Sequence, residues 1–366
     1  MEDVLPCVLK HMPLPQRLRC ALVCRAWAEV AVKVPAVVIC GIKSSDHSEQ
    51  LQHWLGKHGG VVEAMHCSSG TSGATSELQL HVPKFTQLRS LQLYDVKAQL
   101  PAQEMSDCAT VLPQLQKLGL RFCNLTVQLA SQLLSATTLT SLQWERVNLH
   151  KRDWTEELQP QEGAAILLQQ LQLLPSLASL QLACSDMTAA DIAPLSNLHN
   201  LQRLTLDSPT KGSPTDVRAL LAALQHLTQL QHLELRECQL HRAEALPGPQ
   251  HEVHQCFSAL TASTQLTALV LANRKYNVLP QAAFKHMFPA GRMLEELKAL
   301  CLDSDRQMSH FCVEAAQVAV IATSCPQLQQ LRLVGVTGKG FDTGCLLQLP
   351  PGVTRVEGLD WVRPAP

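Results

Sequence analysis

The sequence has few aromatic residues, no excess of either charge and no long apolar run. Aromatic residues make up 4% of its 366 residues, and 30 lysines and arginines stand against 31 aspartates and glutamates. A formal charge of −1 gives no overall attraction to nucleic acid or to anionic lipid, so neither is expected as a partner. No apolar stretch approaches the roughly 20 residues that span a bilayer, so no membrane segment is expected.

A secretory signal is also lacking. The opening residues, MEDVLPCVLK, have neither a basic start nor a long apolar core. The 14 cysteines are scattered singly along the chain, which favours a reducing compartment and free, mostly buried thiols over a disulfide framework. We therefore expect a cytoplasmic or nuclear protein, or one found in both compartments.

Patterns that carry catalysis are missing as well. The segment GVTGKG at Gly335 does not have the residue order of a phosphate-binding loop. The cluster His251-x-x-His254-x-Cys256 stands without a fourth metal ligand at a recognisable spacing. No nucleophile motif accompanies the acidic residues and histidines. We expect no catalytic residue, no metal and no cofactor, and hence a protein that is not an enzyme.

What is abundant is leucine at a fixed spacing, L-x-x-L-x-L. Successive copies begin 24 to 38 residues apart, and they read LRSLQL from Leu88, LQKLGL from Leu115, LTSLQW from Leu139, LASLQL from Leu177, LQRLTL from Leu201, LQHLEL from Leu230, LTALVL from Leu266, LKALCL from Leu297, LQQLRL from Leu328 and, degenerate, VTRVEG from Val353. This periodicity is the signature of a leucine-rich repeat.

Each repeat predicts a strand followed by a helix. The leucines alternate with polar residues at the period of a half-buried strand. The intervening segments TVQLASQLLSA, GAAILLQQLQLL, PTDVRALLAALQHL and CVEAAQVAVIATSC carry apolar residues at helical spacing. Cys123 and Cys238 follow complete copies, at a position where a side chain can bond to loop backbone. The expected fold is an α/β horseshoe solenoid with a parallel sheet on its concave face.

The concave face is the usual partner-binding surface of such solenoids. The residue directly after the third leucine of each repeat should point outward. An unknown client protein is expected to contact this position and nearby loops, and a solvated face without a ligand is the alternative for any one residue. Three inserts follow strand exits, around Trp154, after Leu240 and around Tyr276. The candidate client contacts are Tyr94, Arg121, Glu145, Trp154, Asp207, Arg236, Arg274, Tyr276 and Asp303.

Residues 13–34 do not follow the repeat. Pro15 suits the first turn of a helix, and a broad apolar stripe follows from Leu18 to Ala31. An earlier helical segment runs from Val4 to Met12 and ends at Pro13. Short helices of this total length bury too little surface to be stable alone, so this module needs a partner or a larger body to dock on.

The stretch PLPQRLRCALVCRAW, from Pro13 to Trp27, resembles the second half of an F-box, the motif that docks on the Skp adaptor of cullin–RING ubiquitin ligases. Leu14-Pro15 stands for the second Leu-Pro pair of the family, and Val23 to Trp27 for its Val-Cys-[Arg/Lys]-x-Trp ending. The SCPQLQQLRL phrase at Ser324 resembles the repeats of F-box leucine-rich repeat proteins. The resemblance implies an adaptor interface made of Leu9, Met12, Leu14, Pro15, Val23 and Trp27.

The beginning of the motif fits in two ways. Leu5-Pro6 can serve as the opening Leu-Pro pair, which leaves the first helix one turn short. Alternatively, Val4-Leu5 and Val8-Leu9 belong to the body of that helix, so that its first turn is absent, and this alignment keeps the distance to Leu14-Pro15. A different interpretation of Val23–Trp27 is a helical cap over the first repeat, although the later residues 34–80 can serve that need.

The expected domains are an F-box at 1–33, degenerate capping repeats with a flexible loop at 34–80, and leucine-rich repeats at 81–366. The resemblance implies a substrate-recognition subunit of a Skp–cullin–F-box ubiquitin ligase. Its partners would be the Skp adaptor, through it the cullin and RING subunits, and a client. The rival hypothesis is an interaction scaffold with a vestigial F-box.

Overall fold

The structure is a computed structural model whose residues fall into two compact units, an N-terminal unit, Met1–Leu177, and a C-terminal unit, Ala178–Pro366. It describes residues 36–42, 45–69, 77–80, 84–100, 112–150, 158, 160–183, 187–209, 213–245, 255–276, 278–280, 283–289, 291–304, 313–334, 343–358 and 361–362. The six predicted adaptor contacts and Trp154 lie outside these residues. Across the described ranges, no helix is both long and apolar enough to cross a membrane.

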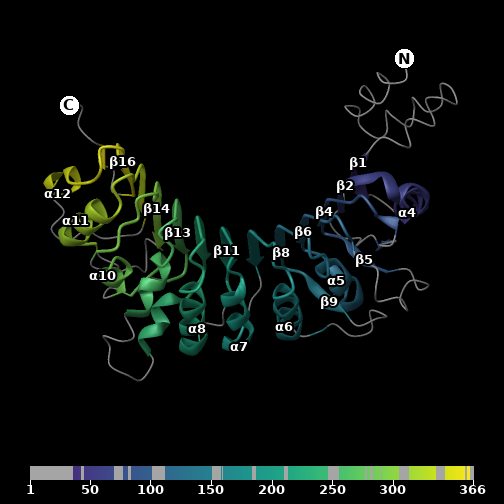
Figure 1. Cartoon of the computed structure of the whole chain (residues 1–366), viewed down its shortest axis with the longest axis horizontal. Helices are drawn as coiled ribbons and strands as arrows, with labels where there is room; N and C mark the ends of the chain where they lie inside the picture. The colour runs from purple at the N-terminus through teal and green to yellow at the C-terminus, as the bar shows by residue number, and fades with distance from the viewer. Residues whose placement is uncertain are drawn as a thin grey trace, which may run out of the picture. The chain divides into compact units, whose positions relative to one another are not determined.

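The N-terminal unit contains a sheet of parallel strands, one from each repeat (Figure 1). Its strands, in spatial order, are β1 (Ala36–Ile42), β2 (Val62–Ser69), β4 (Ser90–Tyr94), β6 (Lys117–Arg121) and β8 (Ser141–Glu145). The helix α4 (Ser45–His58) connects β1 to β2. β1 pairs in parallel with β2, and β2 pairs in parallel with β4. The division into degenerate capping repeats at 34–80 stays a prediction.

A second sheet in the N-terminal unit was not predicted. It consists of the three-residue strands β3 (Glu77–Gln79), β5 (Lys97–Gln99), β7 (Asn124–Thr126) and β9 (Asn148–His150), paired in parallel in that order. Helices α5 (Val127–Leu134) and α6 (Pro160–Leu171) follow β7 and β9. The rule of one strand and one helix per repeat is therefore wrong here, because each chain segment forms a second short strand as it leaves the first sheet.

The C-terminal unit continues the same construction. Its parallel strands are β10 (Ser179–Ala183), β11 (Arg203–Asp207), β12 (His232–Arg236), β13 (Ala268–Asn273), β14 (Ala299–Ser304), β15 (Gln330–Val334) and β16 (Arg355–Glu357). A last strand, β17 (Trp361–Val362), pairs with β16 in the antiparallel sense. The degenerate copy VTRVEG thus forms a true repeat strand.

Connections in the C-terminal unit range from full helices to single turns. Predicted helices are confirmed at α8 (Pro214–Leu224) and α11 (Ala315–Ser324), and both lie on the same side of the strands (Figure 1). Other connections contain α7 (Ala189–Ile192), the 3-10 helices η4 (Ala193–Asn197), η5 (Leu240–Ala245) and η6 (Cys256–Thr261), α10 (Phe284–Met287) and α12 (Thr343–Leu347). The expectation of a full helix in every repeat is therefore wrong, because several connections contain only a 3-10 helix or a single helical turn.

The backbone fixes the register of each strand at both ends. At the start, one carbonyl accepts two successive N–H groups of the next repeat: Gln202 O accepts from Gln231 N at 2.7 Å and from His232 N at 3.0 Å. At the exits of β4, β6, β8, β11 and β12, the residue after the strand adopts a left-handed conformation, as Ser208 does with φ of 50°. The Ser208 N–H then donates to Arg236 O at 2.9 Å. Successive leucines consequently stack in register and are buried.

Candidate functional site

The outward face of each sheet presents the predicted client contacts. The position after the third leucine of each repeat, here named the exit row, holds Tyr94, Arg121 and Glu145 in the N-terminal unit and Asp207, Arg236 and Asp303 in the C-terminal unit. None of these side chains is buried, whereas the residue before each of them, a leucine or, before Glu145, Trp144, is buried. Their outward placement follows the sequence pattern, and their role in binding stays a prediction.

A compact group of aromatic and arginine side chains, the Tyr94 cluster, lies on the face of the N-terminal unit. It consists of Tyr94, Arg121, Phe122, Glu145 and Arg146. The rings of Tyr94 and Phe122 meet edge to face, with centroids 5.5 Å apart. The guanidinium of Arg121 lies 5.6 Å from the Tyr94 centroid, and that of Arg146 lies 5.4 Å from the Phe122 centroid. The few residues that contribute most to binding at protein interfaces are enriched in tyrosine and arginine, so this cluster has the composition of a protein-binding hot spot.

Phe122 and Arg146 join this cluster because of the backbone turn at each strand exit. Both have positive φ, 55° and 49°, although neither is glycine. The Phe122 N–H donates to Glu145 O at 2.9 Å, which holds the turn against the neighbouring strand. The left-handed turn thereby adds a second side chain that is not buried at five exits, Asp95, Phe122, Arg146, Ser208 and Glu237.

A second outward row was missed by the sequence analysis. It lies between the second and third leucines and is here named the middle row. Strand register places its members side by side, His66, Gln92, Gly119 and Gln143 in the N-terminal unit and Gln181, Thr205, Glu234, Val270, Cys301, Arg332 and Glu357 in the C-terminal unit. The period of two along a strand was the signal that could have found this row.

Within the middle row, Glu234 is an acidic residue with two cationic or ionisable partners on its own strand. Its carboxylate lies 2.8 Å from the guanidinium of Arg236 and 3.8 Å from the ring of His232. The His232 ring, and after it the Arg236 guanidinium, lower the pKa of Glu234 to about 2, against the opposing effect of burial. Glu234 is therefore ionised throughout the physiological pH range.

The loop after β13 presents the predicted contacts Arg274 and Tyr276. The buried Asn273 shapes this loop: its Oδ1 accepts from the backbone N–H groups of Lys275 and Tyr276, each at 3.0 Å, and its Nδ2 donates to Cys238 O at 3.0 Å. Arg274 and Tyr276 are exposed, and the Tyr276 ring lies 5.1 Å from that of His241. The chain has two tyrosines, and both keep about two fifths of their surface exposed beside a strand exit.

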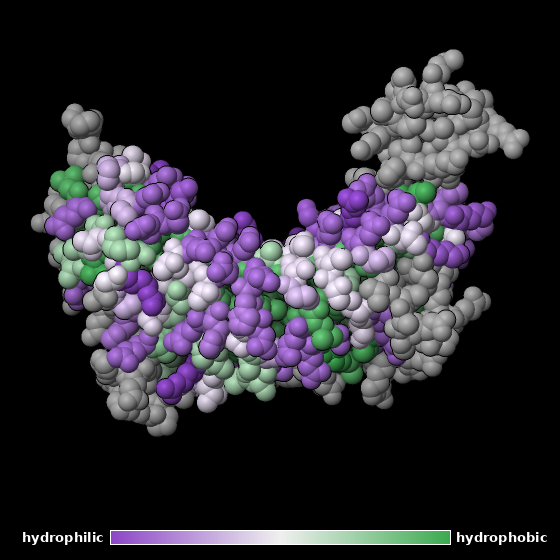
Figure 2. Space-filling view, in the orientation of Figure 1, coloured by the Kyte–Doolittle hydropathy of each residue, from purple (hydrophilic) through white to green (hydrophobic). Residues whose placement is uncertain are grey.

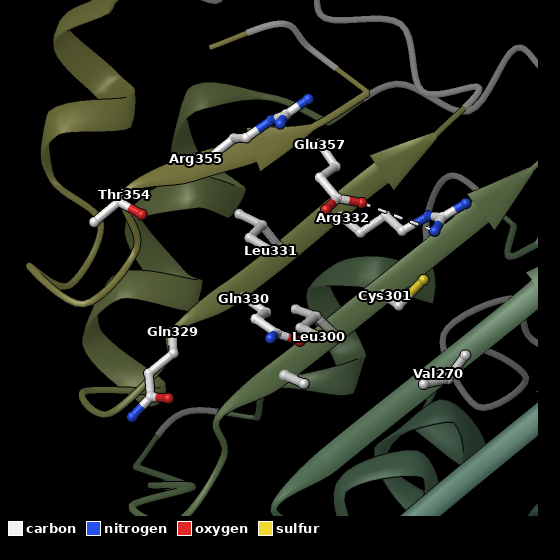
Figure 3. A pocket seen from close by; sticks show the side chains of 11 residues that line it. Val270, Leu300, Cys301, Gln329, Gln330, Leu331, Arg332, Thr354, Arg355 and Glu357 are labelled. Carbon is white, nitrogen blue, oxygen red and sulfur yellow. Dashed lines mark ion pairs between the residues drawn. The ribbon is translucent and has the colours of Figure 1, made fainter. Parts of the chain in front are cut away.

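A hollow of about 400 Å³ lies on the outward face of the C-terminal unit (Figure 3). Val270 and Cys301 are neighbours in the middle row, and Arg332 and Glu357 continue that row beside them. Arg332 pairs with Asp303 at 3.1 Å and with Glu357 at 3.8 Å. The lining is completed by Ala299, Leu300, Gln329, Gln330, Leu331, Thr354 and Arg355.

The described thiols have structural surroundings. The Cys123 Sγ–H lies within 3.3 Å of the carbonyls of Leu93 and Arg121, as expected for a residue that bonds to loop backbone, and burial raises its pKa to about 11. Burial also raises the pKa of Cys238, whose Sγ lies 3.5 Å from Arg236 O. Within the described part of the chain, no three potential metal-ligating side chains gather to hold an ion. The segment with His251 and His254 lies outside it.

The surface around these features is polar overall. In Figure 2 the C-terminal unit shows mostly hydrophilic and intermediate residues, with hydrophobic areas in small patches. In the part of the chain that the structure describes, this view therefore shows no broad apolar surface on the C-terminal unit.

Comparison with known proteins identifies the N-terminal module. Residues 2–35 match the F-box domain family. No curated protein matches the sequence. Similar solved structures include the Rad7 and Elc1 complex of yeast, with 16% identity over 90% of this chain and 82% of that one and a TM-score of 0.41. Another is an internalin of Listeria monocytogenes, with 15% identity over 87% of this chain and 96% of that one and a TM-score of 0.38.

Leucine-rich repeats account for most strands of the residues that the structure describes. Strands with the L-x-x-L-x-L register are β4, β6 and β8 in the N-terminal unit and β10 to β15 in the C-terminal unit. The chain thus carries a match to the F-box domain at residues 2–35, ahead of strands that repeat the leucine register.

Proposed function

We propose that this chain is the substrate-recognition subunit of a Skp–cullin–F-box ubiquitin ligase, in the cytoplasm, the nucleus or both. The observation that carries the proposal is the F-box match at residues 2–35, which ends directly before the first repeat strand at Ala36. F-box domains bind Skp-type adaptors, and repeat solenoids bind proteins on their outward strand face. One chain therefore carries both a handle for the ligase and a surface for a client.

The proposed mechanism is proximity rather than catalysis. The F-box holds the adaptor through Leu9, Met12, Leu14, Pro15, Val23 and Trp27, as the resemblance implies. The outward face holds the client, with the Tyr94 cluster as the leading contact surface and Trp154 as a further loop contact. Holding both partners on one chain raises the effective concentration of the client at the ubiquitin-charged enzyme. The chemistry belongs to the other subunits.

Co-purification with a Skp adaptor tests the first half of this proposal. The full chain is co-expressed with the adaptor, and we expect a one-to-one complex on gel filtration. The variant Trp27→Ala should lose the complex, because a large aromatic anchor is removed from a small interface. The variant Tyr94→Ala, changed on the sheet face instead, should keep it.

The outcome also separates the rival function. A well-folded chain that forms no complex with the adaptor contradicts the ligase proposal. If it still binds client proteins through the Tyr94 cluster, the chain is an interaction scaffold. A complex that forms equally well with Trp27→Ala would contradict the adaptor interface that the resemblance implies.

A further inference from the structure

On the outward face of the C-terminal unit, the side chains of β13 and β14 are much shorter than those of β12 and β15. Along the middle row the order is Glu234, Val270, Cys301 and Arg332, so that two short side chains lie between two long charged ones. The neighbouring row towards the strand starts repeats this order with His232, Ala268, Ala299 and Gln330. The hollow itself reaches from Val270 on β13 to Arg355 and Glu357 on β16. With strands about 4.8 Å apart it spans about 14 Å, the length of about four residues of an extended chain.

The low part of this surface is apolar. Val270 and Ala299 contribute only hydrocarbon, and burial raises the pKa of the Cys301 thiol to about 11. Cys301 is therefore protonated at neutral pH, and it acts as a small neutral side chain instead of a nucleophile. An apolar floor of this kind favours an aliphatic side chain from a partner.

The two arginines of the hollow differ in how they are satisfied. Arg332 has carboxylates at 3.1 and 3.8 Å, from Asp303 and Glu357. Arg355 lines the same hollow and is exposed, and among the described residues no carboxylate pairs with it. Arg332 is thus held in place as part of the wall, while Arg355 offers a positive charge for a ligand's carboxylate.

We propose that this hollow binds an extended segment of a client protein, which places an aliphatic side chain over Val270 and Cys301 and a carboxylate against Arg355. The inference rests on the proposed client-binding function and specifies the client chemistry at one place on the face. Charge complementarity with Arg355 selects an acidic residue near the aliphatic one.

The openness of the site favours a peptide over a small molecule. Pockets for small molecules usually enclose most of the ligand surface. Here the side chains of Arg332 and Glu357 keep 47% and 55% of their surface exposed, so the hollow is open on its solvent side. A side chain that projects from a longer chain fills such a hollow while its neighbours bind the rim.

A peptide selection with the full chain tests the proposal. A displayed library of random 12-residue peptides is selected on the wild-type chain and depleted on the variant Cys301→Trp, whose indole fills the hollow. We expect recovered peptides to carry leucine, isoleucine, valine or methionine close to aspartate or glutamate. Synthetic copies should bind Cys301→Trp about tenfold more weakly or worse, because a central anchor is excluded.

A charge reversal gives the second arm and does not disturb the floor. Selection on Arg355→Glu should recover peptides with lysine or arginine in place of the acidic residue. The matched control Arg218→Glu, at an exposed position of α8 away from the hollow, should leave the acidic preference unchanged. Thermal melting of each variant controls for folding. Recovered peptides that bind Cys301→Trp as well as wild type, or an acidic preference that survives Arg355→Glu, would overturn the proposal.

Two further outcomes identify other occupants. Self-association of the wild-type chain that Cys301→Trp abolishes would show a second copy in the hollow and contradict the proposal. Failure to enrich any peptide would contradict it as well. Adaptor binding is measured separately on the same preparations and does not depend on Cys301. Loss of the hollow's function and loss of the ligase function are therefore distinguishable.

Discussion

Arg121 donates two hydrogen bonds to Glu145 across neighbouring strands. The Nε–H lies 2.7 Å from one carboxylate oxygen, and an Nη lies 3.3 Å from the other. This bidentate geometry fixes the guanidinium beside the ring of Tyr94, 5.6 Å from its centroid. The Tyr94 cluster is consequently ordered before any partner arrives, which reduces the side-chain entropy that binding would otherwise cost.

A double-mutant cycle measures the strength of this relationship. Arg121→Ala, Glu145→Ala and the double variant should give a coupling free energy of about 0.5–1 kcal/mol in urea denaturation, as for a cross-strand ion pair that is partly shielded from water. Arg89 and Glu63 provide the control. Their atoms are 3.6 Å apart with 54% and 37% of the side chains exposed, so their cycle should give almost no coupling. Equal coupling for both pairs would contradict this interpretation.

Glu234 predicts how stability depends on acidity. The pKa of its carboxyl falls from the ordinary 4.5 to about 2 on folding. Its stabilising contribution is therefore complete above pH 4.5, and it is lost as the pH falls towards 2, because the unfolded chain takes up the proton first. At pH 7 the wild type should have a larger free energy of unfolding than Glu234→Gln. This difference should become smaller by pH 2.5. A difference that stays constant over this range would contradict the assignment.

At position 208, we expect glycine to be tolerated better than a β-branched residue. Its φ of 50° suits glycine and penalises β-branched side chains. Ser208→Val should lower the free energy of unfolding by about 1–2 kcal/mol, and Ser208→Gly should change it little. Thr205, within the extended strand β11, should reverse this order, with valine tolerated and glycine destabilising by about 0.5–1 kcal/mol. Chemical denaturation of the four variants compares the two positions directly.

Two glycines should respond in opposite ways to the same change. A Cβ at Gly119 would lie 3.4 Å from the Gln92 side chain, an ordinary contact, so Gly119→Ala should stabilise the chain by about 0.5–1 kcal/mol. Gly358 has φ of +95°, and a Cβ there would collide with the Leu333 carbonyl. Gly358→Ala should destabilise the chain by about 1–3 kcal/mol. The melting temperatures should move apart, and a common direction would contradict the argument.

The sequence pattern predicted the strands better than the segments between them. Three apolar residues per repeat define which side chains are buried, so the strands that carry an L-x-x-L-x-L copy, and the exit row on them, followed directly. The short strands of the second sheet could not be found, because three residues such as Lys97–Gln99 contain too few positions to show an alternation. The middle row could have been predicted from the same alternation. The hollow at Cys301 could not, because it depends on which small residues become neighbours across strands.

The shared carbonyl at the strand starts and the left-handed residue at five of the exits have a consequence for how recognition can change. The strands that end at such an exit, β4, β6, β8, β11 and β12, have five residues each, while the spacing between repeats varies from 24 to 38 residues. Added residues therefore accumulate in the connections and leave the outward face undisturbed. The backbone position of each outward side chain is therefore constant. A single substitution there changes the chemistry at one position and leaves the neighbouring side chains in place.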